Sequence, residues 1–215
     1  MGKEYEYTFA TFNRTNTIKK LQEIKAKQVG IYLFKICVFT HPLNKPNTYI
    51  RIRDEGHRVT MTIKSDLQQS FATENEVNIN DFKTGIEIYK QLGCKMKYQS
   101  EKIREIWECT DGSHISFDMV PGKPERMEIE SPTQEILDNL TKKLGFNPAD
   151  SVTKNENDIY FSLFGVKVPN DMGLDFENVE KNLGPLVTKN KKEFTKLINL
   201  QKQYYEKIKK MNNKS

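Results

Sequence analysis

KEYEYTF, residues 3–9, alternates polar with aromatic residues from its second position onward. Successive side chains of a β-strand point to opposite faces, so Glu4, Glu6 and Thr8 share one face and the aromatic side chains share the other. The aromatic face suits a hydrophobic core, whereas two neighbouring carboxylates do not. The segment therefore predicts a strand whose second face meets charged partners from elsewhere in the chain.

The same spacing by two recurs in later segments, and each places charged or hydroxyl-bearing residues on one face. These polar sets are Arg51 and Arg53; Arg58, Thr60, Thr62 and Lys64; Glu74, Glu76 and Asn78; Lys102 and Arg104; Ser116 and Asp118; and Glu128 and Glu130. The positions between them are largely apolar, and a tight turn is expected at Glu55 and Gly56. The segments predict an antiparallel sheet with one charged face and one apolar face that helices cover.

Helices are expected between these strands. Ile18, Leu21 and Ile24 mark an amphipathic helix that stops near Gly30, and further helices are expected over residues 81–93 and, shorter, around residues 158–165. A further helix is expected to begin at Ser131, which precedes a proline and a glutamine at the positions of a first-turn proline and a capping-box partner.

Composition favours a globular protein with polar groups in its interior, since hydrophobic residues make up 36% and charged residues 29% of the 215 residues. The chain has no apolar run of membrane-spanning length and no N-terminal signal sequence, so a cytoplasmic protein without a membrane partner is expected. The cysteines Cys37, Cys94 and Cys109 are odd in number and lack CxxC spacing. Neither a zinc site nor a disulfide framework is therefore predicted.

The net charge of +5 arises at the C-terminal end, because residues 189–215 hold nine lysines and two glutamates. Apolar residues from Phe194 to Met211 recur there at helical spacing, which predicts a lysine-rich helix docked by its apolar side. A polyanion-binding helix is the alternative. We expect a main domain over residues 1–180 and this appended helix within residues 181–215.

The charged face has two interpretations. Antiparallel sheets often expose one face to water, and such a face needs no ligand. Solvated faces usually mix charges of both signs, however, whereas each strand here carries mostly one sign. If the strands close into a barrel with this face inward, acidic strands oppose basic strands across the lumen.

Such a lumen predicts a ligand. Two carboxylates about 4 Å apart repel by about 4 kcal/mol at an effective dielectric constant of 20, so the glutamate pairs need cations. Mg²⁺ or Mn²⁺ fits, because these ions prefer oxygen ligands and keep waters for a substrate phosphate. Arginine and lysine match phosphate oxygens, and several in a row imply more than one phosphate. The predicted ligand is a metal-bound polyphosphate.

In this order the motifs resemble those of the CYTH family, the triphosphate tunnel metalloenzymes, which include class IV adenylate cyclases and thiamine triphosphatases. The resemblance covers about residues 3–178 and rests on Glu4-x-Glu6, YIRIR, TMTIK, Glu74-x-Glu76, Lys102-x-Arg104, Asp118 and Glu128-Ile129-Glu130. It implies an α+β fold in which an eight-stranded antiparallel β-barrel, or tunnel, is flanked by helices. The lumen would bind a triphosphate with Mg²⁺ or Mn²⁺.

The resemblance also implies roles for single residues. The metal ligands would be Glu4, Glu6, Glu128 and Glu130. The phosphate-binding residues would be Arg51, Arg53, Lys64, Lys102 and Arg104, with Asp118 positioning a basic neighbour. Glu74 and Glu76 would hold a second metal ion or orient the attacking group. The family motif ExExK has a lysine where this chain has Thr8, and Lys3 or Arg14 is expected to compensate from a strand end.

The predicted function is metal-dependent hydrolysis of the terminal phosphate of a nucleoside or inorganic triphosphate. Hydrolysis is preferred because it needs no pocket for a nucleotide base, and no motif that would recognise a base is found. A class IV adenylate cyclase, which makes cyclic AMP and pyrophosphate from ATP, is the first alternative. An RNA 5′-triphosphatase that uses the lysine-rich helix is another, although nucleic acid is the less favoured partner. Thr8 in place of lysine adds a fourth candidate, a triphosphate-binding protein without catalysis. The oligomeric state is left open.

Overall fold

The structure is a computed structural model, and it describes residues 5–65, 73–152 and 156–212. Within these residues, eight antiparallel strands form one sheet in the order β1-β8-β7-β6-β2-β3-β4-β5. The strands are β1 (Tyr5–Phe9), β2 (Lys27–Thr40), β3 (Tyr49–Asp54), β4 (Val59–Ser65), β5 (Thr73–Ile79), β6 (Lys95–Glu108), β7 (His114–Met119) and β8 (Arg126–Ser131). The segments that alternate in the sequence therefore all join the same sheet.

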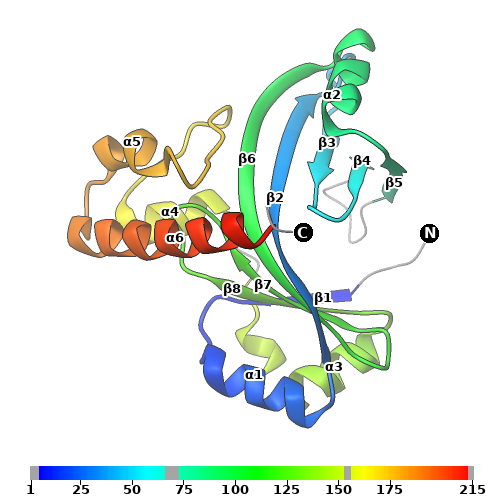
Figure 1. Cartoon of the computed structure of the whole chain (residues 1–215), viewed down its shortest axis with the longest axis vertical. Coiled ribbons are helices and arrows are strands. Elements are labelled where there is room, and N and C mark those ends of the chain that lie inside the picture. Colours follow the sequence, from blue (N-terminus) through cyan, green and yellow to red (C-terminus); the bar gives the residue numbers. More distant parts are fainter. Residues whose placement is uncertain (1–4, 66–72, 153–155, 213–215) are drawn as a thin grey trace.

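The two 14-residue strands β2 and β6 set the shape of the sheet. They pair with each other along nearly their whole length, and both curve strongly, as Figure 1 shows. Strands β3, β4 and β5 extend the sheet on the β2 side, and β7, β8 and β1 extend it on the β6 side. The sheet therefore has a concave side and a convex side.

The predicted α+β fold with an antiparallel sheet and flanking helices is confirmed, but the sheet is not closed into a barrel. Its edges are β1 and β5, and no ladder joins them in the described residues. Both edges carry acidic residues of the predicted lumen, Glu6 on β1 and Glu74 and Glu76 on β5. Direct pairing of these strands would add Glu74 and Glu76 to an edge where Glu6 already faces Glu130, and this additional like-charge repulsion opposes closure.

The described residues form the helices α1 (Arg14–Glu23), α2 (Phe82–Gln91), α3 (Gln134–Lys143), α4 (Glu156–Phe164), α5 (Val179–Leu183) and α6 (Lys191–Asn212), with short 3₁₀ helices at Pro148–Asp150 and Gly184–Leu186. Among them, no helix has the length and apolar composition that crossing a membrane requires. The predicted end of the first helix is wrong. Helix α1 ends at Glu23, because Lys25 takes a φ of 62° and reverses the chain, and Gly30 lies within β2.

The predicted start of α3 is wrong by two residues. Ser131 is the last residue of β8, where it pairs with Tyr5 of β1. The N-cap is Thr133, whose Oγ1 accepts a hydrogen bond from the backbone N–H of Ile136 at 3.2 Å. Strand pairing therefore takes Ser131 away from the helix, and the next hydroxyl residue caps it.

The apolar faces predicted for the strands are buried under the helices. Helices α1 and α3 cover β1, β7 and β8 through a core of Phe9, Leu21, Trp107, Ile115, Phe117, Met127, Ile129, Leu137, Leu140 and Leu144. Helix α2 covers β2 and β3 through a smaller core that includes Ile52 and Tyr89. Burial of these faces leaves the opposite face of the sheet to the charged side chains.

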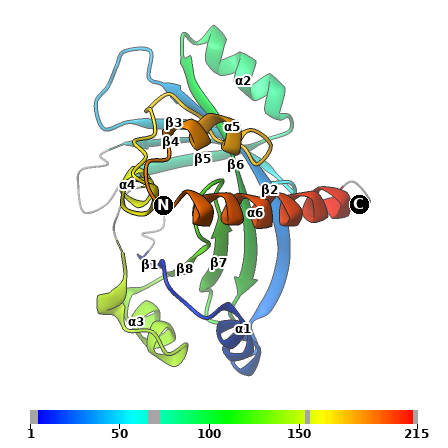
Figure 2. The same ribbon diagram turned by 90° about the vertical axis from the view of Figure 1, so that its left-hand side faces the viewer.

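Helix α6 crosses the convex side of the sheet, as Figure 2 shows. Its apolar side joins a core of Ile103, Phe176, Tyr205 and Ile208. The amide of buried Gln201 bonds to the backbone of residues 120–123, which connect β7 to β8. The predicted docked C-terminal helix is therefore present. The domain division between residues 180 and 181 stays a prediction, and α5 runs across it.

The segment before α5 lies along β6. The backbone N–H of Glu101 donates to the carbonyl oxygen of Leu174 at 2.9 Å, and the N–H of Phe176 donates to the Glu101 carboxylate at 3.2 Å. A Cβ atom at Gly173 would lie 1.7 Å from the carbonyl oxygen of Gln99. Glycine is therefore required for this close approach to the sheet.

Candidate functional site

The predicted polar sets lie together on the concave side of the sheet, which we call the inner face. Strand register shows this, because residues paired across neighbouring strands share a face. Such pairs are Glu6 with Glu130, Thr8 with Glu128, Arg104 with Asp118, Arg51 with Thr62, Arg53 with Thr60, and Lys64 with Glu74. The inner face therefore collects acidic and basic side chains from both arms of the sheet.

Asp118 on β7 is the centre of a buried ion cluster, and its side chain has no exposed surface. The Arg104 Nε donates to Asp118 Oδ1 at 2.6 Å, and the Lys102 Nζ donates to Asp118 Oδ2 at 3.0 Å. Arg104 also forms an ion pair with Glu128 on β8. Asp118 thus contacts both basic residues of β6, and such contacts are needed if Asp118 is to position them. The roles of these residues toward a substrate stay predictions.

The charges of this cluster depend on one another. Burial opposes the charged form of Asp118, but Lys102 and Arg104 outweigh it and hold the pKa of Asp118 well below its ordinary value. Burial likewise opposes the charged form of Arg104, yet Asp118 and Glu128 raise the pKa of Arg104. Burial prevails at Lys102 and lowers the pKa of this lysine to about 8, despite the attraction of Asp118. Lys102 is therefore charged less strongly than an exposed lysine, and it loses its charge at a lower pH.

A second ion network joins β3, β4 and β5. The Arg51 Nη2 lies 3.4 Å from a Glu74 oxygen and 3.7 Å from a Glu76 oxygen, and Lys64 also pairs with Glu74. The Arg53 Nη2 lies 3.7 Å from Glu76. Burial, and next the charge of Arg51, lower the pKa of Arg53. These cations already have carboxylate partners, and an additional anion would relieve the repulsion between the two arginines.

Glu55 belongs to this network, and the sequence interpretation missed it. The Glu55 side chain is 4% exposed and pairs with Arg53 and with Arg58, whose Nε lies 2.8 Å away. The predicted turn at Glu55 and Gly56 is displaced by one residue, because the N–H of Glu55 donates to the carbonyl oxygen of Arg58 at 2.9 Å. The spacing by two from Arg53 to Glu55 is the sequence signal that identifies it.

Three predicted metal ligands lie on the adjacent strands β1 and β8. Glu6 pairs in register with Glu130, and Glu128 is two residues away on the same strand. Burial, and next the charge of Glu128, raise the pKa of Glu6, whereas Lys64 on β4 is the first of the cations that lower this pKa. Lys64 acts on Glu6 although β4 and β1 lie in opposite arms of the sheet. The curvature thus brings the two arms within electrostatic reach across the inner face.

The donor chemistry of this group fits a hard divalent cation, because carboxylate oxygens are the ligands that Mg²⁺ and Mn²⁺ prefer. Glu4, the fourth predicted ligand, lies outside the described residues. In the part of the chain that the structure describes, no three histidine, cysteine or acidic side chains form a ready metal-binding group. Glu128 instead contacts Arg104 and Arg126. Metal binding by Glu6, Glu128 and Glu130 stays a prediction.

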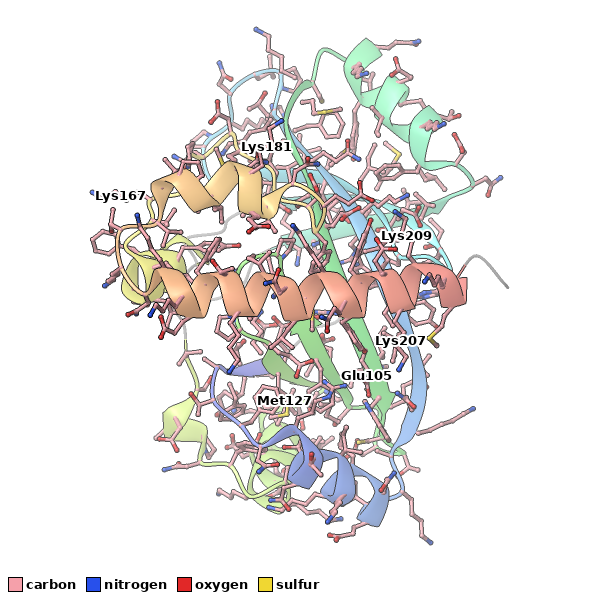
Figure 3. All side chains as sticks on the ribbon, turned by 60° about the vertical axis from the view of Figure 1, so that its left-hand side comes forward. Glu105, Met127, Lys167, Lys181, Lys207 and Lys209 are labelled. Atoms are coloured by element: carbon pink, nitrogen blue, oxygen red, sulfur yellow. The ribbon has the colours of Figure 1, made fainter. Side chains whose placement is uncertain are left out.

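The arginine expected to compensate for Thr8 lies on the opposite face. Arg14 belongs to α1 on the helix-covered side of the sheet, where it pairs with Glu105 and Glu125. Figure 3, viewed from that side, labels Glu105 beside α6. The helix position therefore directs Arg14 away from Thr8. Lys3, the other candidate, lies outside the described residues.

Arg126 is a second residue of the inner face that the sequence interpretation missed. It is the first residue of β8 and pairs in register with Asp118 of β7. The Arg126 Nη2 lies 3.2 Å from Glu128 Oε1 and 4.0 Å from Asp118 Oδ2. The polar set of this strand begins at residue 126 rather than 128, and the alternation in RMEIES carries that signal.

The charges of this arrangement suit a polyanion, and its carboxylates have the donor chemistry that a divalent cation prefers. Basic side chains of β3, β4 and β6 face the same concave surface as the carboxylates of β1 and β8. Guanidinium and ammonium groups neutralise phosphate oxygens, and a metal ion held by carboxylates can bridge further ones. Charge neutralisation and positioning are the main requirements for phosphoryl transfer.

Comparisons with known proteins show that this fold occurs in other chains. Solved structures with the same fold include a Pyrococcus horikoshii OT3 protein that is 21% identical, with a TM-score of 0.59, covering 74% of this chain and 99% of that chain. A "putative adenylate cyclase" of Vibrio parahaemolyticus is 16% identical, with a TM-score of 0.63, and the match covers 74% of this chain and 97% of that chain. A "putative adenylyl cyclase" of Hippeastrum, whose name reports a dominant triphosphatase activity, is 14% identical, with a TM-score of 0.51 and coverage of 75% and 96%.

A search of curated proteins gives no match. The family model of the CYTH domain matches residues 3–154, which include all the strands and the inner-face residues described above. The match covers more than half of the chain. The protein therefore belongs to the CYTH domain family.

Proposed function

We propose that the protein is a divalent-metal-dependent hydrolase that removes the terminal phosphate of a nucleoside or inorganic triphosphate bound on the inner face. One observation carries the proposal: the paired cations of β3, β4 and β6 share this face with the carboxylates of β1 and β8. A solvated sheet has no need for a fully buried aspartate that holds two cations. A site for a charged ligand accounts for that arrangement.

In this proposal Arg51, Arg53, Lys64 and the Asp118-held pair Lys102 and Arg104 bind the phosphate oxygens. They neutralise the charge that builds up while water attacks the terminal phosphorus and the bond to the bridging oxygen breaks. Glu74 and Glu76 orient the attacking water and accept its proton. Glu6, Glu128 and Glu130, with Glu4, would hold Mg²⁺ or Mn²⁺, which supplies Lewis-acid polarisation of a phosphoryl oxygen when bound.

A class IV adenylate cyclase uses the same binding groups, and its reaction differs in the nucleophile. The ribose 3′-hydroxyl would attack the α-phosphorus, and pyrophosphate would leave. Hydrolysis is favoured because it needs no pocket for a nucleotide base, and the name of the Hippeastrum protein, which has the same fold, reports a dominant triphosphatase activity.

The RNA 5′-triphosphatase alternative gains no support from the C-terminal helix. Helix α6 packs on the convex side of the sheet, opposite to the inner face, and Figure 3 shows Lys207 and Lys209 there. Lys202 and Lys209 pair with Glu180 and Glu177. These lysines therefore do not line the inner face.

The test is incubation with inorganic triphosphate, ATP and GTP in the presence of Mg²⁺ or Mn²⁺, with separate detection of orthophosphate, pyrophosphate and cyclic nucleotide. Orthophosphate with a diphosphate product supports hydrolysis. Cyclic AMP with pyrophosphate selects the cyclase instead. Tight binding without products identifies a binding protein, and absence of both binding and products overturns the proposal.

Glu130→Gln is expected to lower metal-dependent turnover by about 10²-fold or more, since it removes one charge from the carboxylate group that would hold the cation. The melting temperature should stay the same or rise, because the repulsion with Glu6 is relieved. Glu180→Gln removes a carboxylate from the convex side and serves as the matched control. Full activity of Glu130→Gln would exclude this carboxylate from the site.

Triphosphate binding is expected to weaken as the pH rises through about 8, because Lys102 loses its charge there. The loss can reach about tenfold in Kd per pH unit, the limit for one proton. Lys102→Arg stays charged at every pH of the series, so its Kd should change much less between pH 7 and 9. Isothermal titration calorimetry of both proteins with inorganic triphosphate separates this effect from ionisation of the ligand. If Kd changes with pH in the same way in both proteins, Lys102 is not the source of the pH dependence.

A further inference from the structure

We propose that Arg126 is a phosphate-binding residue and supplies the positive charge that β1 lacks at Thr8. The inference rests on the proposed function, because it assigns a further contact to the same triphosphate. Within their described ranges, β1, β7 and β8 contain one lysine or arginine, and that residue is Arg126. The other proposed phosphate ligands come from β3, β4 and β6. A triphosphate bound across the inner face therefore meets one cation on this arm of the sheet.

The position of Arg126 on the inner face follows from its partners. It is paired in register with Asp118 and lies two residues from Glu128, so all three side chains share a face. Arg104 contacts one oxygen of Glu128, and Arg126 contacts the other at 3.2 Å. The two guanidinium groups therefore bracket a single carboxylate. This geometry presents two guanidinium groups at one point, and guanidinium groups match the geometry of phosphate oxygens.

The burial of Arg126 distinguishes it from its neighbour Asp118. The Arg126 side chain is 21% exposed, whereas the Asp118 side chain is fully buried. Arg126 can therefore reach a ligand on the inner face while Asp118 and Glu128 hold its orientation.

Thr8 faces the same carboxylate from the other side. It is paired in register with Glu128 on β1, and its hydroxyl can hydrogen-bond to a phosphate but carries no charge. A lysine at this position would lie beside Glu128, as Arg126 does. The two positions are thus alternative sources of one positive charge, which makes the inference testable by exchanging them.

The experiment measures Kd for inorganic triphosphate with Mg²⁺ by isothermal titration calorimetry. Arg126→Ala is expected to weaken binding about tenfold or more. The double variant Thr8→Lys with Arg126→Ala should regain most of that loss, which a purely structural role of Arg126 would not produce. Arg14→Ala is the matched control, because it also removes an arginine with two carboxylate partners, but from the opposite face. Its Kd should equal that of the parent.

The outcomes separate this inference from the proposed function. If the parent does not bind triphosphate, the proposed function fails first. If the parent binds and Arg126→Ala binds equally well, Arg126 is not a phosphate ligand. If Arg126→Ala binds triphosphate more weakly and the added Thr8→Lys substitution does not restore binding, Arg126 does not supply the charge that is missing at Thr8. If Arg126→Ala fails to fold by circular dichroism, Arg126→Gln, which keeps hydrogen-bonding capacity without charge, replaces it in the same comparison.

Discussion

Asp118→Asn is expected to lower the free energy of unfolding by about 3–5 kcal/mol, the range for removing one partner of a buried ion pair. The substitution keeps the shape of the side chain but leaves Lys102 and Arg104 buried beside a neutral group. Urea denaturation at pH 7, followed by circular dichroism, measures the change. No other substitution of an inner-face residue should destabilise the fold as strongly, because Asp118 holds two cations without solvent exposure.

The stability difference between parent and variant should depend on pH, in a direction set by the pKa of Asp118. The folded-state pKa of Asp118 is lowered, so its contribution to stability is present above the ordinary aspartate pKa of about 3.9 and is lost as the pH falls below it. The difference between parent and variant should therefore shrink in acid. Glu177→Gln, which removes the exposed partner of Lys209, is the control and should leave the urea midpoint unchanged. A variant as stable as the parent would contradict the central role of Asp118.

Arg53→Ala is expected to abolish most of the thermal stabilisation that triphosphate confers. At a ligand concentration of 100 times Kd, binding stabilises the folded state by about 2.7 kcal/mol, which raises the melting temperature of a chain of this size by about 5–10 °C. Arg53 contributes a guanidinium that is 13% exposed on the inner face, beside Arg51. The parent should therefore show the shift, and the variant should show little of it.

Differential scanning fluorimetry with inorganic triphosphate and Mg²⁺ provides the measurement. Arg14→Ala is again the matched control, since this arginine lies on the helix-covered face and should keep the full shift. Equal shifts in the parent and in Arg53→Ala would show that the YIRIR segment does not contact the ligand. The comparison also decides between a binding face and a solvated sheet, the two interpretations that the sequence left open.

The alternation of side chains along single strands could be predicted from the sequence. Burial of Ile50, Ile52, Met127 and Ile129 follows from their period of two, and the same period assigns Arg51, Arg53 and Glu128 to the other face. The resemblance of the ordered motifs to the CYTH family is confirmed by the match over residues 3–154. These features depend on local spacing or on the order of motifs along the chain, so they can be recognised without knowledge of the fold.

Boundaries and compensating residues were harder to predict. Ser131 has the sequence signature of an N-cap, yet pairing with Tyr5 draws it into β8, and Thr133 takes its place. Arg14 is close to Thr8 in sequence, yet α1 carries it to the opposite face, where Glu105 and Glu125 bind it. In each case a partner distant in sequence decides the outcome.

The sequence by itself determined which residues share a face, because side-chain direction in a strand depends on the parity of position along the chain. Tertiary structure alone decided which charges meet. The curvature of β2 and β6 brings Lys64 within electrostatic reach of Glu6, and the register of β7 and β8 sets Arg126 beside Asp118. Electrostatic contacts depend on distances between strands far apart in sequence, and those distances are set by sheet curvature and register rather than by any local pattern.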